Sequence, residues 1–258
     1  MQLENRVAIV TGAAGAIGRG ICKVLQQRGM KIVVADLNQE ACDQFAAELR
    51  AKGGDALGVA VGVTSKTAIR AMVDKVLGHY GQIDALVNNA GIIELGPLVD
   101  LSEEQWDRVI DVNLKGSFLC TQAVVPTMIA QQRGRIVNFA SVAAKRPAPL
   151  QSAYAASKHG VVGLTQVWCQ ELALHNITVN TVCPGFVDSP MWGQHLGPAY
   201  AAQVGVAAAE VVSALAKSMM PLGRPQQPED IGEAVAYLCV ADNVTGQSLV
   251  VDGGYSMY

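Results

Sequence analysis

The sequence lacks the features that mark membrane and secreted proteins. Charged residues, glycine or proline interrupt every apolar run before it reaches the roughly 18 residues that a membrane-spanning helix needs. Residues Met1–Arg6 lead directly into an apolar strand pattern, without the basic start, apolar segment and small-residue cleavage site of a signal peptide. We therefore expect a cytoplasmic protein with no membrane partner.

Charged residues are also scarce, and the cysteines are not closely paired. Charged residues make up 16% of the chain, the formal net charge is −3, and Lys and Arg form no runs. A nucleic-acid partner is not expected, because phosphate backbones attract clusters of basic side chains. The six cysteines form no Cys-x-x-Cys pair and have no histidine at metal-ligand spacing. This pattern favours reduced, buried thiols and no metal site.

What the sequence does contain is a repeated alternation of strand and helix patterns. Seven short runs rich in Val, Ile, Leu and Ala recur between longer amphipathic segments. They span Arg6–Val10, Lys31–Ala35, Ala56–Val61, Ile83–Val87, Arg135–Phe139, Thr178–Val182 and Ser248–Val251. Nearly continuous apolar strands are typical of a parallel sheet covered by helices on both faces. Right-handed crossovers then give an α/β, Rossmann-like, doubly wound parallel sheet.

No segment has the composition of an interdomain linker, so we expect one domain over residues 1–258. One region departs from the alternation. The segment from Phe186 to Leu222, rich in Ala, Val and Met, offers helical pieces but no further strand. Because it follows a strand at the carboxyl edge of the sheet, it is predicted to be a helical substrate lid.

A glycine-rich loop follows the first strand. The segment Thr11–Gly20 includes Gly12, Gly15, Ile17 and Gly18 and opens a helix that is expected to run to about Arg28. Small residues let the backbone approach a pyrophosphate, and the helix N-terminus offers free N–H groups and a partial positive charge. Tight packing between strand and helix is the alternative explanation of such a loop.

The cofactor preference depends on Asp36. This carboxylate ends the second strand, 18 residues after Gly18, where the adenosine ribose of a dinucleotide would lie. It would accept hydrogen bonds from the ribose hydroxyls and repel a 2′-phosphate. Neither Leu37 nor Gly15 supplies a compensating cation, so NAD is favoured over NADP. The alternative for Asp36 is a helix cap or a solvated carboxylate.

Three residues in the second half of the chain form a candidate acid–base group. Tyr154 and Lys158 are four residues apart and share one face if the segment is helical. A nearby ammonium stabilises a phenolate, so we expect Lys158 to lower the pKa of Tyr154. Tyr154 would then exchange a proton with a substrate oxygen, which Ser141, at the end of a strand, would hold. Taken singly, these residues are more often a surface pair and a cap.

Together, these motifs and their order resemble the short-chain dehydrogenase/reductase superfamily, in its compact form and over nearly the whole chain. The motifs are the Thr11–Gly18 loop, Asn88–Gly91, Asn113, Ser141, Tyr154-x-x-x-Lys158, Pro184-Gly185 and Val251–Gly254. The resemblance implies a metal-free hydride transfer between a nicotinamide and an alcohol or carbonyl group. It also implies a homotetramer.

The resemblance assigns roles to four residues, which we call the tetrad: Asn113, Ser141, Tyr154 and Lys158. Tyr154 would be the acid/base, and Ser141 would orient the substrate oxygen. Lys158 would lower the tyrosine pKa and hold the nicotinamide ribose hydroxyls. Asn113 would hold a proton-relay water, whereas its alternative role is to pack helices.

The remaining cofactor contacts follow from the same resemblance. The backbone of the glycine-rich loop and Asp36 would bind the adenosine half, together with Val63 against the adenine. Asn89 would border the cofactor, and Val187 would meet the carboxamide. Tyr154 and Lys158 also count as cofactor residues, beside Gly12, Gly15, Ile17 and Gly18.

Three positions depart from the family pattern. The family usually has glycine where Ala16 stands, and often an Asp for adenine where Gly62 stands. Loss of that one hydrogen bond would weaken NAD binding by about 1 kcal/mol. The connection Cys239–Thr245 is shorter than usual, which affects an expected subunit contact.

The start of the lid bears on the substrate. Pro190-Met191-Trp192 resembles the lids of NAD-dependent polyol, sugar-alcohol and diol dehydrogenases. Trp192 would flank a small hydroxylated substrate or anchor the lid, and Gln151 and His195 are candidates to bind hydroxyls. A lid histidine is more often exposed, and Arg146 is expected to be a solvated loop charge rather than a phosphate contact.

The preferred hypothesis is therefore an NAD-dependent dehydrogenase that interconverts a secondary alcohol, such as a polyol, and its ketone. A 3-oxoacyl-thioester or other carbonyl reductase has the same fold and tetrad, although biosynthetic reductases of this family generally use NADP. A noncatalytic dinucleotide-binding regulator is the third possibility. Such noncatalytic members usually have an incomplete tetrad.

Overall fold

The computed structural model describes residues 1–256, except for the side chains of Gln194, His195 and Gln203. Its centre is one parallel sheet of seven strands in the order β3-β2-β1-β4-β5-β6-β7. The strands are β1 (Val7–Thr11), β2 (Lys31–Asp36), β3 (Ala56–Ala60), β4 (Ala85–Asn88), β5 (Gly134–Phe139), β6 (Ile177–Pro184) and β7 (Ser248–Val251). The prediction of a doubly wound parallel sheet is confirmed, and no predicted strand end is off by more than two residues.

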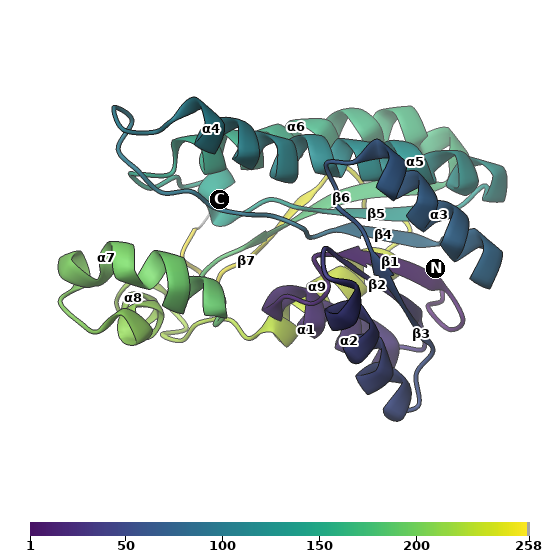
Figure 1. Cartoon of the computed structure of the whole chain (residues 1–258), viewed down its shortest axis with the longest axis horizontal. Coiled ribbons are helices and arrows are strands. Elements are labelled where there is room, and N and C mark those ends of the chain that lie inside the picture. Colours follow the sequence, from purple (N-terminus) through teal and green to yellow (C-terminus); the bar gives the residue numbers. More distant parts are fainter. Residues whose placement is uncertain (257–258) are drawn as a thin grey trace.

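Helices cover both faces of the sheet (Figure 1). The longer ones are α1 (Ala16–Gln27), α2 (Gln39–Ala51), α3 (Lys66–Tyr80), α4 (Glu103–Ile110), α5 (Gly116–Gln131), α6 (Ser152–Leu172), α7 (Gly197–Val204), α8 (Val211–Met219) and α9 (Pro228–Val240). In Figure 1, α3, α5 and α6 lie above the sheet, while α1, α2 and α9 lie below it. The sheet is therefore the middle of three layers.

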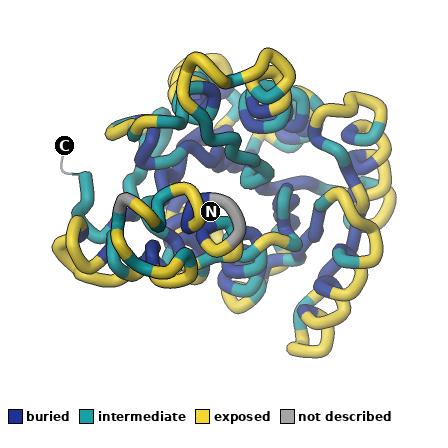
Figure 2. Tube along the Cα trace, turned by 60° about the vertical axis from the view of Figure 1, so that its left-hand side comes forward, coloured by how far each residue is buried: buried dark blue, intermediate teal, exposed yellow. Residues whose placement is uncertain are grey.

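The alternation of side chains along β1 explains these layers. Ala8 and Val10 belong to the core cluster that includes α1, α2 and α9 residues. Val7 and Ile9 point the other way, into the cluster with α3 and α5. Because successive strand residues face opposite sides, an apolar strand needs cover on both. Figure 2 shows the result, with buried residues concentrated along the central strands and exposed residues on the outer helices.

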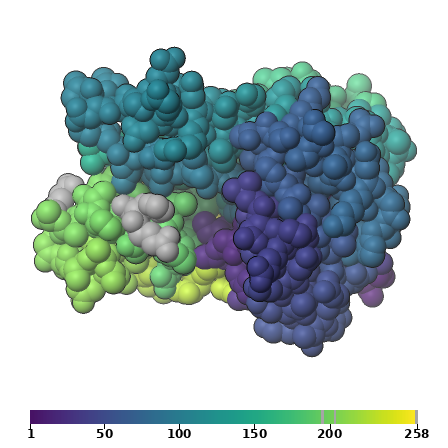
Figure 3. Space-filling model, viewed as in Figure 1, coloured from purple at the N-terminus to yellow at the C-terminus, as the bar shows by residue number. Residues whose placement is uncertain are grey.

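The lid segment, residues 186–222, contains a π-helical turn at Trp192–Leu196, then α7, a 3₁₀ turn at Ala208–Glu210, and α8. In its described part it adds no strand to the sheet, apart from an isolated bridge between Val187 and Gln226. Figure 1 shows α7 and α8 together at one end of the molecule, and Figure 3 shows their green surface below the helices near residue 100. Within residues 1–256, no helix is both long enough and apolar enough to cross a membrane.

Candidate functional site

The glycine-rich loop packs tightly against its neighbours at two of its glycines. Gly12 has a φ of +63°, and a Cβ there would lie 2.9 Å from the Cα of Ala90. A Cβ on Gly18 would lie 2.3 Å from the carbonyl oxygen of Gly12. Side chains are therefore excluded at both positions. At Gly15 a Cβ would meet only one atom, at 3.4 Å, so this glycine is not needed for space.

Helix α1 leaves its first turn free for an anion. Gly15 is its N-cap residue, no side chain caps it, and its first turn contains no acidic residue. Ala16, where the family usually has glycine, is the first helical residue. A helix N-terminus without a side-chain cap, beside a loop of mostly small residues, fits the pyrophosphate of a dinucleotide.

Asn89 holds the loop in place. Its side-chain amide donates hydrogen bonds to the carbonyl oxygens of Thr11 at 2.9 Å and of Gly12 at 3.0 Å. In return, the hydroxyl of Thr11 accepts hydrogen bonds from the backbone N–H groups of Asn89 and Ala90, both at 3.1 Å. Asn89 also lines the pocket described below, and its place beside a cofactor stays a prediction.

Asp36 is fixed beside the same loop. One carboxylate oxygen accepts the backbone N–H of Ala14 at 2.9 Å, and the other accepts that of Leu37 at 2.7 Å. Leu37 itself is largely exposed, and Gly62 lies next to it. The nearby Arg19 stacks 4.0 Å from the centre of the Phe45 ring and pairs with Glu48. The structure therefore holds a carboxylate beside the glycine-rich loop, and the cation that follows this loop is paired with Glu48.

The two predicted valine contacts differ in position. Val63 is buried, and its Cγ2 would lie 2.8 Å from a Cβ on Gly116, so it packs against the start of α5. Val187 is also buried and lines the pocket at the start of the lid. Their contacts with adenine and carboxamide stay predictions.

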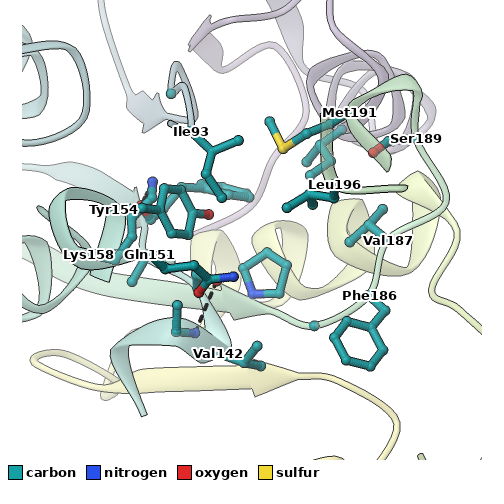
Figure 4. Close-up of a pocket in the computed structure, with 18 of the residues that line it drawn as sticks. Ile93, Val142, Gln151, Tyr154, Lys158, Phe186, Val187, Ser189, Met191 and Leu196 are labelled. Atoms are coloured by element: carbon teal, nitrogen blue, oxygen red, sulfur yellow. Dashed lines mark hydrogen bonds between the residues drawn. The ribbon is translucent and has the colours of Figure 1, made fainter. Parts of the chain in front are cut away.

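Tyr154 and Lys158 lie one turn apart at the start of α6. The Lys158 Nζ is 5.6 Å from the centre of the Tyr154 ring and donates a hydrogen bond to the carbonyl oxygen of Phe139 at 2.8 Å. Lys158 is buried, whereas Tyr154 is half-buried and directs its hydroxyl into the pocket (Figure 4). The third residue, Ser141, follows β5 and accepts the backbone N–H of Ala143 at 3.1 Å. These three side chains line one pocket, and their catalytic roles stay predictions.

The effect of Lys158 on the pKa of Tyr154 stays a prediction, because burial and other groups set the shift in this structure. Burial raises the pKa of Tyr154 above its ordinary value of 10.0, hydrogen bonding with Ser141 opposes the shift, and the charge of Cys183 adds to it. Burial also lowers the pKa of Lys158 to about 8, which the charge of Cys183 opposes. Desolvation is the largest cause of both shifts, and the lysine amine donates its hydrogen bond to Phe139.

Asn113 lies behind the pocket, in a π-helical turn at Asp111–Lys115 between α4 and α5. Its amide donates to the carbonyl oxygen of Ile92 at 2.9 Å and to the hydroxyl of Ser157 at 3.0 Å, and its oxygen accepts the N–H of Ile92 at 2.8 Å. Ser157 in turn donates to the carbonyl oxygen of Tyr154 at 2.7 Å. Asn113 thus positions the first turn of α6. Its part in a proton relay stays a prediction.

The pocket has a volume of about 160 Å³ and lies between the tetrad side and the lid. Figure 4 shows Tyr154 and Lys158 on one side and Val187, Met191 and Leu196 on the other. Gln151 lines the pocket and donates a hydrogen bond to the Tyr200 hydroxyl at 3.4 Å, so it contacts α7. The His195 side chain lies outside the described residues.

Trp192 serves as lid anchor and pocket wall together. It is 9% exposed and belongs to an apolar cluster of lid residues. Its ring meets Phe186 edge-on, with centroids 5.4 Å apart. Both rings line the pocket, so the two alternatives for Trp192 are not exclusive in this structure.

Tyr255 is a pocket residue that the sequence did not reveal. Its ring lies 5.0 Å from Phe186 and under the guanidinium of Arg146, at 4.5 Å. Arg146 is exposed, as expected of a loop charge, but it also lines the pocket and donates to the Tyr255 carbonyl oxygen at 3.1 Å. The only signal in the sequence was an aromatic residue after Gly253-Gly254.

Comparison with known proteins adds three findings. The profile of the family "short chain dehydrogenase" matches residues 6–197. A 3-oxoacyl-[acyl-carrier-protein] reductase of Thermotoga maritima is 41% identical over 256 residues, which are 98% of this chain and 99% of that protein. A (2S)-[(R)-hydroxy(phenyl)methyl]succinyl-CoA dehydrogenase subunit of Thauera aromatica is 38% identical over 100% of this chain and 99% of that protein.

Among solved structures, a short-chain type dehydrogenase/reductase from Mycobacterium marinum superposes with a TM-score of 0.88 at 32% identity. The match covers 99% of this chain and 97% of that one.

Proposed function

The chain belongs to the short-chain dehydrogenase family, and from this premise we propose that it interconverts a 3-oxoacyl thioester and its 3-hydroxyacyl form with NAD(H). It is an oxidoreductase, and its family binds nicotinamide dinucleotides. The observation that carries the proposal is the convergence of Ser141, Tyr154 and Lys158 on a pocket whose lid side is apolar.

The apolar lid favours an acyl chain over a polyol. Lid residues that line the pocket include Phe186, Met191, Trp192 and Leu196, and Ser189 is the one polar side chain among the described lid residues there. A polyol would leave several hydroxyl groups against this surface without hydrogen-bond partners, at a cost of about 1–3 kcal/mol for each group. The names of the Thermotoga and Thauera relatives also describe thioester substrates, which supports the same class.

NAD(H) is proposed in preference to NADP(H) because of Asp36. Its carboxylate lies where the resemblance places the adenosine ribose, and it is bonded to the loop through Ala14. The cation that directly follows the glycine-rich loop, Arg19, pairs with Glu48 and stacks on Phe45. A 2′-phosphate would therefore meet a negative charge without compensation.

The tetrad residues carry out the proton chemistry. When bound, the nicotinamide supplies the hydride for reduction of the substrate carbonyl carbon, or accepts it in oxidation. Tyr154 gives its proton to the carbonyl oxygen in reduction and takes it back in oxidation, so the alcohol is formed by one hydride and one proton. Ser141 donates a hydrogen bond to the same oxygen, where negative charge develops. Lys158 keeps a cation beside the phenol, and Asn113 fixes the backbone of the first turn of α6.

We further propose a cytoplasmic homotetramer. Phe118 on α5 and Val167 on α6 are 39% and 51% exposed, and a subunit contact through these two helices would cover them. Light scattering coupled to gel filtration will measure the mass directly.

Steady-state assays test the proposed activity. The purified protein is expected to oxidise NADH with 3-oxobutanoyl-CoA and with the corresponding N-acetylcysteamine thioester, and to leave alditols and diols unoxidised with NAD. Turnover of a polyol without turnover of either thioester would overturn the substrate class.

The role of Tyr154 is tested with one variant and one matched control. Tyr154→Phe should lower kcat by about 10²- to 10⁴-fold, as is usual when a general acid is removed, while NADH binding measured by fluorescence is retained. Tyr237→Phe removes an exposed hydroxyl on α9 and should change nothing. Equal activity of both variants would favour the noncatalytic regulator.

A further inference from the structure

Four side chains from three distant parts of the chain form one wall of the pocket. In order they are Arg146, Tyr255, Phe186 and Trp192, with successive separations of 4.5, 5.0 and 5.4 Å between the guanidinium carbon or ring centres. We call this set the stacked wall. All four residues line the pocket.

The C-terminal member of the wall is held firmly. The carboxylate of Asp252, which is 5% exposed, accepts the backbone N–H of Gly254 at 3.0 Å and that of Ser256 at 2.7 Å. These bonds hold the backbone on both sides of Tyr255, and its ring contacts Phe186 and Arg146. The ring is therefore a shelf for the guanidinium above it.

Arg146 and Lys158 are the charged residues among those that line the pocket, and no carboxylate lines it in the described part of the chain. Lys158 is buried and bonded to Phe139. Arg146 is exposed, and no Asp or Glu within residues 1–256 forms an ion pair with it. The pocket thus has a positive rim that its own residues do not neutralise.

The contacts of Arg146 leave it ready to bind. Its guanidinium lies over the Tyr255 ring, and one nitrogen donates to the Tyr255 carbonyl oxygen. Stacking uses the face of a guanidinium and leaves N–H groups at its edge, which match carboxylate and phosphate oxygens in pairs. Holding the group in advance also reduces the entropy that binding would cost.

We propose that Arg146 binds an anionic group of the substrate, a carboxylate or a phosphate, and that Tyr255 positions it. This inference rests on the proposed function for the reacting carbonyl group. The anion comes from one of two sources: the phosphates of the thioester carrier or a carboxylate on the acyl chain.

Three thioesters distinguish these sources. They are 3-oxobutanoyl-CoA, its neutral N-acetylcysteamine analogue, and the N-acetylcysteamine thioester of a 3-oxo dicarboxylic acid. In Arg146→Gln the KM for one of the two anionic substrates should rise about five- to tenfold, with kcat within about twofold and the neutral substrate unaffected. A rise with the CoA thioester identifies the carrier phosphate, and a rise with the dicarboxylic thioester identifies the acyl carboxylate.

Further variants separate charge from position. Tyr255→Leu should raise log KM for the anionic substrate by about half as much as Arg146→Gln does, because the guanidinium remains but the ring beneath it is lost. Tyr255→Phe keeps the ring and should leave this KM unchanged. Arg70→Gln, on α3 and outside the pocket lining, removes the same charge and controls for long-range attraction. Equal KM changes for neutral and anionic substrates, or no change for any, would overturn the proposal.

The two proposals fail separately. If no thioester is reduced, the proposed function is wrong, and the same variants are then compared on 3-oxobutanoate and its neutral methyl ester. A loss of preference for the acid in Arg146→Gln would still support Arg146 as the anion site. An unchanged preference would reject it.

Discussion

Replacing Asp36 by asparagine should convert the enzyme toward NADP(H). The change removes one negative charge at the end of β2 and keeps the size of the side chain. Two unit charges 4 Å apart interact by about 4 kcal/mol at an effective dielectric constant of 20. Asp36 is half-buried, so solvent screens part of this repulsion. A relief of about 1.4–2.8 kcal/mol remains, which raises the ratio of kcat/KM for NADPH over NADH about ten- to hundredfold.

The hydrogen bonds of Asp36 set a second, separable effect. Its two oxygens hold the N–H groups of Ala14 and Leu37. Asparagine has one acceptor oxygen, so one of these bonds is lost and the free energy of unfolding falls by about 1 kcal/mol. A loss of stability without a change of cofactor ratio would therefore indicate that Asp36 orders the loop but does not face the ribose.

The assay compares NADH and NADPH at subsaturating concentrations with one ketone, and thermal unfolding is followed on the same samples. Asp74→Asn, an exposed aspartate on α3, is the matched control for net charge. Adding Leu37→Arg to Asp36→Asn should increase NADPH use again. The reasoning is refuted if the wild-type protein already prefers NADPH or if the ratio stays within about twofold in Asp36→Asn.

Three further perturbations test the site. Gly18→Ala should weaken NADH binding at least tenfold and lower Tm, because its Cβ would lie 2.3 Å from the Gly12 oxygen; fluorescence titration measures the binding. Asn113→Ala should lower kcat more than it raises KM, since it releases Ser157 and the start of α6. Lys158→Met should be more stable than wild type near neutral pH, because it removes a buried charge, and this difference should shrink as pH rises from about 8 to 10.5. In that window the unfolded wild-type chain holds a lysine proton that the folded chain lacks, so the stability of the wild type rises with pH.

Each of these has a clear contrary outcome. Gly15→Ala is the control for Gly18→Ala, and equal affinities of the two variants would mean that the loop adjusts freely. Asn113→Asp with the full kcat would show that the amide donor of Asn113 is dispensable. A constant difference in Tm between wild type and Lys158→Met from pH 7 to 10 would contradict the lowered pKa of Lys158.

The layers and the cofactor loop were predictable because they depend on local patterns. An apolar run such as Lys31–Asp36 is identified by its composition, and Gly12 and Gly18 by their place after a strand. The ends of β4 were less accurate. Ile83 and Asp84 are buried like strand residues, but β4 itself begins at Ala85, so burial and ladder pairing do not coincide there.

Contacts between distant segments were not predictable in the same way. The hydrogen bond from Arg146 to Tyr255 joins residues 109 positions apart, and the sequence of neither segment indicates that the two are in contact. The upward shift of the Tyr154 pKa could not be predicted, for a related reason. Spacing places Lys158 near the phenol, but it does not show that the amine is bonded to Phe139 or how much water both groups lose.

The position of β7 has a consequence for how the protein is made. Strand β7 pairs with β6, and Tyr255 follows it within four residues, so both leave the ribosome after all the other strands. Until then β6, whose residues are all buried in the finished fold, is an open edge of the growing sheet that invites pairing with other chains. The same late step covers that edge and completes the stacked wall. A chain whose synthesis stops before β7 would therefore be prone to aggregation and would lack a complete substrate pocket. Only chains made to the end of this strand and Tyr255 would be active.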